Sequence, residues 1–291
     1  MTLQSKISKP IKILILNLMP TKEVTEQQLL SRLEFSFLPI ETTWLTTATY
    51  ESKNVSKEHM QKYYKTLDQV RNEYYDGMII TGAPVETLAF DEVLYWEELQ
   101  QIMDWAQTHT KSVLHICWGA QAGIYHHYGI DKRALPKKLS GVYAHHVYTK
   151  NHPLLDGIKE GFVAPHSRYT TVLREDIERE NELTLLAGSD ETECYIAADK
   201  QCKNIFVMGH MEYDLLTLDQ EYHRDLAKEG LNPEIPHNYY PQGDITKEPE
   251  FTWFHDSTVF FSNWIHNYLL EETKSVTNPM IKLMNQKICT N

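Results

Sequence analysis

The sequence predicts an α/β protein built on an open sheet with helices on both faces. Two observations lead to this prediction. Short apolar runs alternate with amphipathic segments in the first half of the chain, and several of these runs are apolar throughout. Strands that are apolar on both faces are typical of parallel sheets, which arise from alternating strands and helices. Ligands bind such sheets outside the carboxyl ends of the strands, so we expect the functional site there.

The predicted elements follow this alternation. Apolar and β-branched runs predict strands at 10–18, 37–45, 77–82 and 111–116. Helical spacing and charge predict helices at 22–33, 57–74, 94–108 and from the end of the fourth strand to residue 127. The section 141–202 is less regular, with short strand candidates at 142–147, 170–173 and 194–198. We expect one domain spanning 1–291, with a polar tail at about 273–291.

The last third of the chain adds a strand at 204–210 and a helix at 215–229. Asp256 is expected to cap a final helix. This helix carries a broad apolar stripe, for which we expect core packing or a subunit contact: Phe260, Phe261, Trp264, Ile265, Tyr268 and Leu269.

Composition excludes several classes of partner. The 291 residues include 40 acidic and 28 basic side chains, a formal charge of −12. Nucleic acid and anionic membranes need a basic surface, so neither is expected as a partner. No run approaches the roughly 20 apolar residues that span a bilayer, and the first residues lack the apolar core of a signal peptide. The four cysteines are few and irregularly spaced, which predicts a reducing compartment, the cytoplasm.

Cys117 lies between the predicted strand 111–116 and a segment rich in small residues. A cysteine at a sharp strand-to-helix turn is lifted clear of the sheet, with the first N–H groups of the helix near its thiol. Gly119 and Ala120 would let backbone and substrate approach closely. On this pattern alone, a catalytic nucleophile and a small buried core cysteine are about equally good interpretations.

A nucleophilic cysteine needs a base, and the base needs an orienting group. His210 and Glu212 follow the strand 204–210 at a spacing of two, which puts both on one side of an extended segment. His127 and His145 are rival bases, but neither has a carboxylate so placed.

Metal and nucleotide cofactors find little support in the sequence. It contains neither Cys-x-x-Cys nor His-Glu-x-x-His, and the histidine pairs at 126–127 and 145–146 would point different ways on regular elements. Glycine-rich phosphate-binding motifs are also missing. We therefore expect no metal site and no permanently bound cofactor.

Several blocks resemble the homoserine O-acyltransferases of methionine biosynthesis. They lie at 15–20, 81–84, 95–99, 115–121 (HICWGAQ), 164–168 (APHSR), 209–213 (GHMEY) and 261–264. The resemblance covers nearly the whole chain, from about residue 11 to 268. It implies a flavodoxin-like open sheet, similar to class I glutamine amidotransferases, that carries a Cys-His-Glu triad. The family's usual Gly-His-Pro-Glu is Gly-His-Met-Glu here, with Met211 in place of the proline.

The resemblance implies a ping-pong transfer of acetyl from acetyl-CoA to L-homoserine through an acyl-cysteine. Cys117 would be the nucleophile and His210 the base, oriented by Glu212. The N–H of Trp118 is our candidate for the oxyanion hole, with a second donor from the loop 82–86. The assembly expected is a homodimer acting on small molecules.

The family's substrate-binding positions match Lys138, Ser167 and Arg224, of which Arg224 suits a bidentate grip on a carboxylate. Without the resemblance, these residues would be a solvated lysine, a turn serine and a helix-surface arginine. In the family, glutamate at the position of Glu86 accompanies acetyl-CoA and glycine accompanies succinyl-CoA. A carboxylate there would repel the succinyl carboxylate, so Glu86 predicts acetyl transfer.

Three alternative functions stay open at this point. The chain could be a serine O-acetyltransferase of cysteine biosynthesis, because one methylene is discriminated by only about 1–3 kcal/mol. It could use succinyl-CoA as the donor. More distantly, it could be a glutamine amidotransferase-type hydrolase that uses the same triad.

Overall fold

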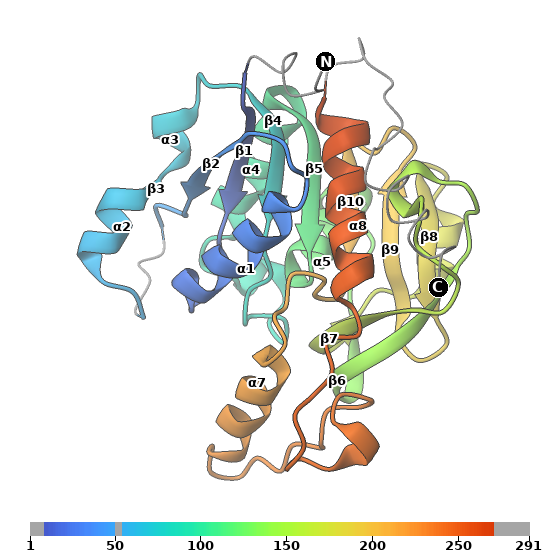
Figure 1. The fold of residues 1–291 in the computed structure, drawn as a ribbon. Coiled ribbons are helices and arrows are strands. Elements are labelled where there is room, and N and C mark those ends of the chain that lie inside the picture. Colours follow the sequence, from blue (N-terminus) through green and yellow to red (C-terminus); the bar gives the residue numbers. More distant parts are fainter. Residues whose placement is uncertain (1–8, 50–53, 271–291) are drawn as a thin grey trace.

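A computed structural model describes residues 9–49 and 54–270. Its ten strands form one array in the order β3-β2-β1-β4-β5-β10-β9-β8-β6-β7 (Figure 1). The tail predicted at 273–291 lies outside the described residues. The strands are β1 (Ile11–Leu16), β2 (Ile40–Leu45), β3 (Tyr64–Lys65), β4 (Tyr75–Ile80), β5 (Thr110–Ile116), β6 (Arg133–Val147), β7 (Phe162–Thr171), β8 (Leu183–Ser189), β9 (Glu193–Asp199) and β10 (Asn204–Val207).

The array has a parallel half and an antiparallel half. β1 to β5 and β10 run parallel, as predicted from the apolar runs. Antiparallel pairing begins where β9 joins β10, and it continues through β8 and β6 to β7. The sequence indicated short strands in this second half, but it did not predict their order or direction.

Alternation along β1 explains why both faces are covered. Ile13 and Ile15 belong to the core cluster shared with α1 and α8, and Leu14 and Leu16 belong to the cluster shared with α4. Successive side chains of a strand point to opposite faces, so an all-apolar strand needs a cover on each. The helices are α1 (Lys22–Glu34), α2 (Lys57–Tyr63), α3 (Leu67–Val70), α4 (Trp96–His109), α5 (Trp118–Tyr128), α6 (Arg174–Arg179), α7 (Thr217–Leu226) and α8 (Phe254–Trp264).

The prediction of one helix over 57–74 is wrong, because α2 and α3 are separated by the short edge strand β3. Tyr64 causes the break. Its ring is buried beside Trp44 of β2, and its hydroxyl donates to Glu26 at 2.6 Å. The final helix also begins at Phe254, two residues before the predicted cap Asp256.

The apolar stripe on the final helix packs into the core. Core packing was one of the two alternatives expected from the sequence, the other being a subunit contact. Phe260, Phe261, Trp264, Ile265 and Leu269 are buried there. The stripe faces the sheet along α8, which crosses the front of the molecule in Figure 1.

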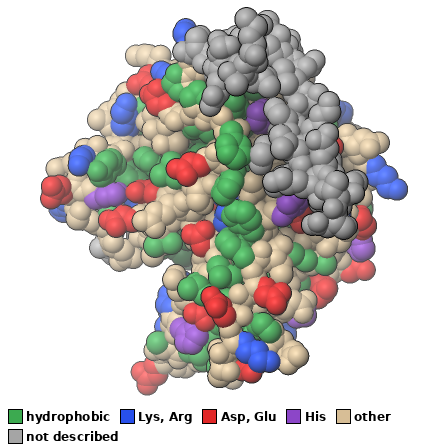
Figure 2. All heavy atoms as spheres, viewed as in Figure 1, with side chains coloured by type: hydrophobic (Ala, Val, Ile, Leu, Met, Phe, Trp, Pro, Cys, Tyr) green, Lys and Arg blue, Asp and Glu red, His purple; other side chains and the backbone are tan. Residues whose placement is uncertain are grey.

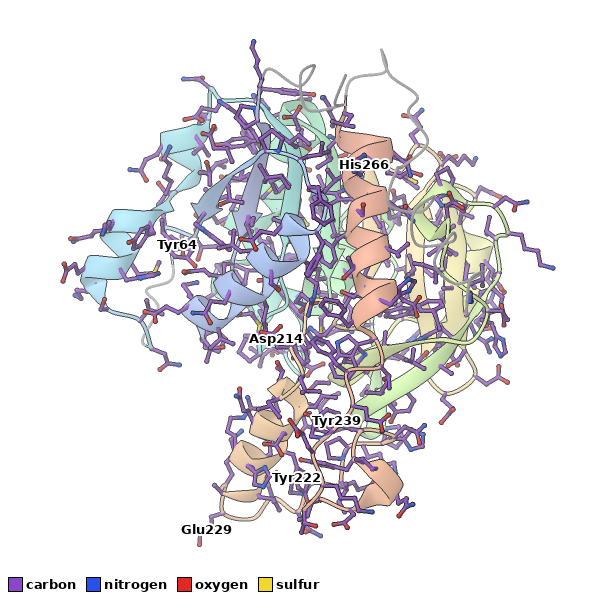
Figure 3. All side chains as sticks on the ribbon, viewed as in Figure 1. Tyr64, Asp214, Tyr222, Glu229, Tyr239 and His266 are labelled. Carbon is purple, nitrogen blue, oxygen red and sulfur yellow. The ribbon has the colours of Figure 1, made fainter. Side chains whose placement is uncertain are left out.

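α7 and the segment after it project from the end of the sheet with β6 and β7 (Figure 1). Figure 3 shows Asp214 at the junction and Tyr222, Glu229 and Tyr239 within the projection. A separate apolar cluster that includes Leu218, Tyr240 and Trp253 holds it together. On the face drawn in Figure 2, acidic and basic side chains are scattered among neutral ones. Within the described residues, no helix has the length and apolar character needed to cross a bilayer.

Gly119 provides a test of how tightly the sheet holds α5. A Cβ at Gly119 would lie 2.6 Å from the carbonyl oxygen of Thr81 and 2.9 Å from that of Ile80. Alanine gains about 1 kcal/mol of helix propensity over glycine, but overpacking typically costs about 1–3 kcal/mol, and backbone atoms cannot move aside as side chains can. We expect Gly119→Ala to lower the free energy of unfolding in urea. An unchanged or higher free energy would contradict the close packing of α5 against β4.

Candidate active site

Cys117 occupies the sharp turn between β5 and α5. Its backbone has φ 52° and ψ −118°, a strained conformation for a residue with a side chain. The strain persists because both sides are fixed: the N–H of Cys117 donates to Val207 of β10 at 2.7 Å, and its carbonyl accepts from Ala120 at 3.0 Å. A Cβ on Gly82 would lie 3.2 Å from the Cβ of Cys117, so the loop after β4 runs directly beside the thiol.

His210 and Glu212 meet at the end of β10. The Nδ1 of His210 lies 2.6 Å from the Oε1 of Glu212, and both side chains are buried. Because the carboxylate accepts the Nδ1 proton, Nε2 is left to face the thiol, and His210 is within hydrogen-bonding reach of Cys117. The structure therefore brings together the three residues that the sequence singled out as nucleophile, base and orienting group.

Neighbouring elements fix the turn that carries His210 and Glu212. The N–H of His210 donates to the carbonyl of Pro165 in β7 at 2.8 Å. The buried guanidinium of Arg32 in α1 donates to the carbonyl of Tyr213 at 3.2 Å. Met211, where the resemblance led us to expect proline, is buried in the main core, and its carbonyl accepts the hydroxyl proton of Ser257. Packing and hydrogen bonds thus restrain this turn without the ring of a proline.

The charges around His210 favour an ion pair with the thiol. Burial by itself lowers the pKa of His210, but Cys117 and Glu212 together outweigh it and raise the pKa well above its usual value. An imidazolium beside a cysteine stabilises the thiolate, which is the nucleophilic form. The imidazole of His210 can therefore take up the thiol proton and release Cys117 as a nucleophile.

Arg168 adds a fixed positive charge that the sequence reasoning did not single out. Its side chain is fully buried, and its donors go to uncharged partners: His166 Nδ1 and the carbonyls of Thr170 and Thr192. Burial lowers the pKa of this guanidinium, and the charges of Cys117 and then Glu86 oppose that effect. Arg168 lay within the 164–168 motif, but nothing in the motif indicated a buried cation near the thiol.

Glu86 lies at the same site, with its carboxylate bound to β7. Its Oε2 accepts from the N–H of Tyr169 at 2.8 Å and lies 3.2 Å from the hydroxyl of Thr170. Burial raises the pKa of Glu86, while these two hydrogen bonds and the charges of Arg168 and His210 act in the opposite direction. The carboxylate thus occupies a small site made by the backbone and hydroxyl of β7 beside a buried cation.

Two of the three predicted substrate-binding residues meet at a carboxylate that the sequence reasoning missed. Lys138 of β6 donates to Asp225 at 2.9 Å, and Arg224 of α7 donates to the same buried carboxylate at 3.1 Å. Burial raises the pKa of Asp225, but hydrogen bonds from Arg224, Lys228 and Lys138 outweigh it and lower the pKa well below its usual range. Ser167 lies on β7 opposite Ser140 of β6, one residue from Arg168.

The rival bases lie in other surroundings. His145 Nε2 is 3.0 Å from His166 Nε2, and burial lowers the pKa of His145 to about 3. His127 lies at the far end of α5, where burial lowers its pKa to about 4.

The expectation that His126 and His127 point different ways is wrong. Their ligand atoms and those of Asp104 all lie within 4.8 Å of one another, close enough to hold a metal ion. His145 and His146 do diverge, since His145 is buried and His146 contacts Glu160 at the surface. At about 1.5 Å per residue, α5 separates the 126–127 pair from Cys117 by roughly 15 Å. That group is therefore no part of the site around the thiol.

Comparison with known proteins identifies a matching family model and similar individual proteins. Residues 3–275 match the model of the homoserine O-succinyltransferase family. A homoserine O-acetyltransferase of Shouchella clausii is 52% identical over 91% of this chain and 85% of its own length. One of Clostridium acetobutylicum is 51% identical over 91% of this chain and 88% of its own.

Solved structures confirm the predicted fold class. A glutamine amidotransferase from Methylobacillus flagellatus superposes with a TM-score of 0.56 at 12% identity, covering 92% of this chain and 98% of its own. One from Thermotoga maritima gives a TM-score of 0.57 at 12% identity, covering 88% and 97%. These likenesses show the fold, an α/β sheet of the class I glutamine amidotransferase type.

The ion pair between Cys117 and His210 can be tested by alkylation of the thiol with iodoacetamide at a series of pH values. A free cysteine has a pKa of about 8.5, so only a few per cent is thiolate at pH 7. We expect His210→Gln to slow alkylation of Cys117 about tenfold or more at pH 7 and to restore the rate at alkaline pH. His59→Gln, which removes a histidine bound to Glu26 on another part of the surface, is the control. Identical pH profiles for His210→Gln and the unmodified protein would exclude the ion pair.

Proposed function

Because the chain belongs to the homoserine O-succinyltransferase family, whose members are acyltransferases, we propose that it transfers acetyl from acetyl-CoA to the hydroxyl of L-homoserine. The chemistry rests on the hydrogen-bonded array of Cys117, His210 and Glu212. The choice of acetyl over succinyl rests on one observation, the seating of the Glu86 carboxylate on β7.

In the first half-reaction, the thiolate of Cys117 attacks the thioester carbonyl carbon of acetyl-CoA. The tetrahedral oxyanion collapses, the bond from carbon to the coenzyme sulfur breaks, and His210 gives its Nε2 proton to the departing thiolate. Free coenzyme A leaves, and acetyl stays on Cys117 as a thioester. His210 is then neutral and able to act as a base.

In the second half-reaction, His210 accepts the proton of the homoserine hydroxyl as the oxygen attacks the acetyl carbonyl. The bond from carbon to the sulfur of Cys117 breaks, which releases O-acetylhomoserine and regenerates the thiolate-imidazolium pair. Glu212 keeps the imidazole in the required tautomer and stabilises its positive charge in both steps.

The start of α5 supports an oxyanion hole. The first hydrogen bond that closes a helical turn is donated by Ala120, so the N–H of Trp118 precedes the intrahelical ladder. We propose this N–H as one donor and a group of the loop 82–86, which runs beside Cys117, as the other.

The acceptor is proposed to bind on the side of β6, β7 and α7. Arg224 is half-exposed, and Asp225 holds it together with Lys138. We propose that the homoserine carboxylate binds to these two cations and that Ser167 contacts the amino acid from β7. Serine as acceptor remains the alternative at this site, since it differs by one methylene.

The proposed preference for acetyl-CoA over succinyl-CoA follows from the place of the Glu86 carboxylate on β7. In an acetyl-enzyme the acyl group ends in a methyl, which needs no charged partner. A succinyl group would bring its own carboxylate toward hydrogen-bond donors that Glu86 already occupies. The negative charge of Glu86 would also repel that carboxylate. The positive field of Arg168 is then balanced by Glu86 and not by the substrate.

The amidotransferase-type hydrolase is the more distant alternative, since the solved relatives named above share the fold at 12% identity. Release of ammonia from glutamine alone would favour it. We propose that the enzyme has no resident cofactor and works in the cytoplasm as a homodimer on small-molecule substrates. The free thiols of Cys117, Cys194 and Cys202 are consistent with a reducing compartment.

Both donor and acceptor can be tested with a matrix of acetyl-CoA and succinyl-CoA against homoserine and serine, following release of free coenzyme A thiol. We expect acetyl-CoA with homoserine to give the highest kcat/KM. In Glu86→Gly, the Tyr169 N–H becomes free to bind the succinyl carboxylate, and the like charge of Glu86 is removed. We expect the ratio of succinyl to acetyl transfer to rise about tenfold or more, as one charge-assisted pair allows. Unchanged donor ratios in that variant would contradict the role given to Glu86.

A further inference from the structure

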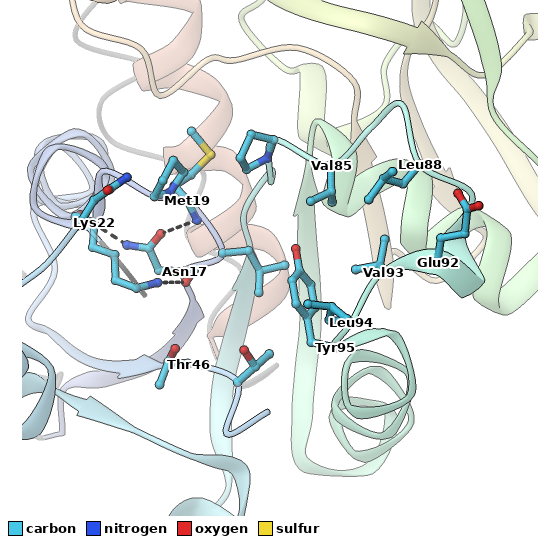
Figure 4. A pocket seen from close by; sticks show the side chains of 15 residues that line it. Asn17, Met19, Lys22, Thr46, Val85, Leu88, Glu92, Val93, Leu94 and Tyr95 are labelled. Carbon is cyan, nitrogen blue, oxygen red and sulfur yellow. Dashed lines mark hydrogen bonds between the residues drawn. The ribbon is translucent and has the colours of Figure 1, made fainter. Parts of the chain in front are cut away.

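A pocket lies outside the carboxyl ends of β1, β2 and β4 (Figure 4). One wall includes Val85 and Leu88 of the segment after β4, and the opposite wall includes Met19 and Lys22 after β1. Its cavity volume is about 250 Å³, a little below the roughly 300–1,000 Å³ common for pockets that enclose a whole small molecule, so it suits part of a ligand. Cys117, His210 and Glu212 do not line it, but the loop 82–86 beside the thiol does so through Pro84 and Val85.

The lining is mostly apolar and partly exposed, which is unusual without a ligand. Leu94 is 83% exposed and Leu88 is 40% exposed, and both border the pocket. Exposed apolar side chains gathered around a hollow are typical of binding sites. The wall after β1 is preformed: Asn17 accepts from the N–H of Met19 at 3.1 Å and donates to the carbonyl of Lys22 at 3.3 Å (Figure 4).

Two contacts connect the pocket to the nucleophile. Val85 is three residues beyond Gly82, which packs against the Cβ of Cys117. Tyr95 lines the pocket and meets the ring of Trp118, the residue after Cys117, edge to face at 6.2 Å between centroids. The pocket therefore lies beside the elements that hold Cys117, next to the loop after β4.

The position of the residues proposed to bind the acceptor indicates which of the two substrates enters the pocket. Lys138, Ser167 and Arg224 lie on β6, β7 and α7, whereas the pocket lies beyond β4, on the opposite side of β5 in the sheet order. The two substrates would thus approach Cys117 from opposite sides. Of the two substrates, only the acyl donor has a long chain attached to its reacting sulfur. That chain contains methylenes, a dimethyl group and two amides.

We propose that this pocket binds the pantetheine arm of acyl-coenzyme A, with the thioester at Cys117. The proposal rests on the proposed function, because it assumes a coenzyme A thioester as donor. Apolar walls with a few polar groups suit a chain that alternates alkyl and amide units.

Filling the pocket tests the proposal. We expect Leu88→Trp, at a lining residue outside the loop 82–86, to raise the KM for acetyl-CoA about tenfold or more, since blocking a few apolar contacts is worth at least that factor. The KM for homoserine should change less than about twofold. The rate with S-acetyl-N-acetylcysteamine, a thioester that lacks most of the arm, should also change less than about twofold, because that donor needs no pocket.

Leu94→Asp is the second variant, since an exposed position tolerates a polar residue without loss of folding. It should raise the acetyl-CoA KM selectively as well. Phe37→Asp is the matched control: Phe37 is 67% exposed but precedes β2, so it lies at the amino end of a strand whose carboxyl end borders the pocket, and the variant should leave all three values unchanged.

The outcomes separate the two proposals. If the unmodified protein made no O-acetylhomoserine from acetyl-CoA, the proposed function would fail first. If it did, but neither variant raised the acetyl-CoA KM, the pocket assignment would be overturned. The same holds if transfer from S-acetyl-N-acetylcysteamine were affected as strongly as transfer from acetyl-CoA.

Discussion

The backbone of Cys117 is held in a left-handed conformation, and the rest of the site is arranged around it. Such strain persists only where the surroundings over-determine it, and here β10, α5 and the loop after β4 all meet at this residue. Gly119 brings α5 against the carbonyls of β4, and Gly82 brings the loop beside the thiol. The parallel half of the sheet thus presents the nucleophile and, after β10, His210 and Glu212, and the antiparallel half supplies Arg168 and the part of β7 that binds Glu86.

Ionisable side chains from both halves of the sheet meet around Cys117 and affect one another's pKa. His210 is buried yet holds its proton, because Cys117 and Glu212 outweigh the cost of burial. Arg168 is buried too, and its positive charge lies in the field of the thiol and of Glu86. The buried side chains of Arg168 and His210 therefore lie near the carboxylates of Glu86 and Glu212 and near the thiol, in a low-dielectric setting where unpaired charges would be costly. This balance links the thiolate to the group that we propose selects the acyl chain.

The parallel half of the fold was predictable because its strands are apolar throughout and its helices have clear periodicity. The triad candidates were also visible, since strand ends and a spacing of two are local features. Asp225 and Arg168 were not, because their roles depend on burial and on partners far away in the sequence. The break at Tyr64 was missed for the same reason: the contacts with Trp44 and Glu26 override the local helical pattern.

The central claim is that Cys117 carries the acyl group, and intact-protein mass spectrometry tests it most directly. Incubation with acetyl-CoA without an acceptor should add the mass of one acetyl group, mapped to the peptide that contains Cys117. Homoserine should then remove it with formation of O-acetylhomoserine, and Cys117→Ala should show neither the adduct nor the product. Full acetyl transfer by Cys117→Ala, or turnover in the unmodified protein without any acetylated Cys117, would contradict the account.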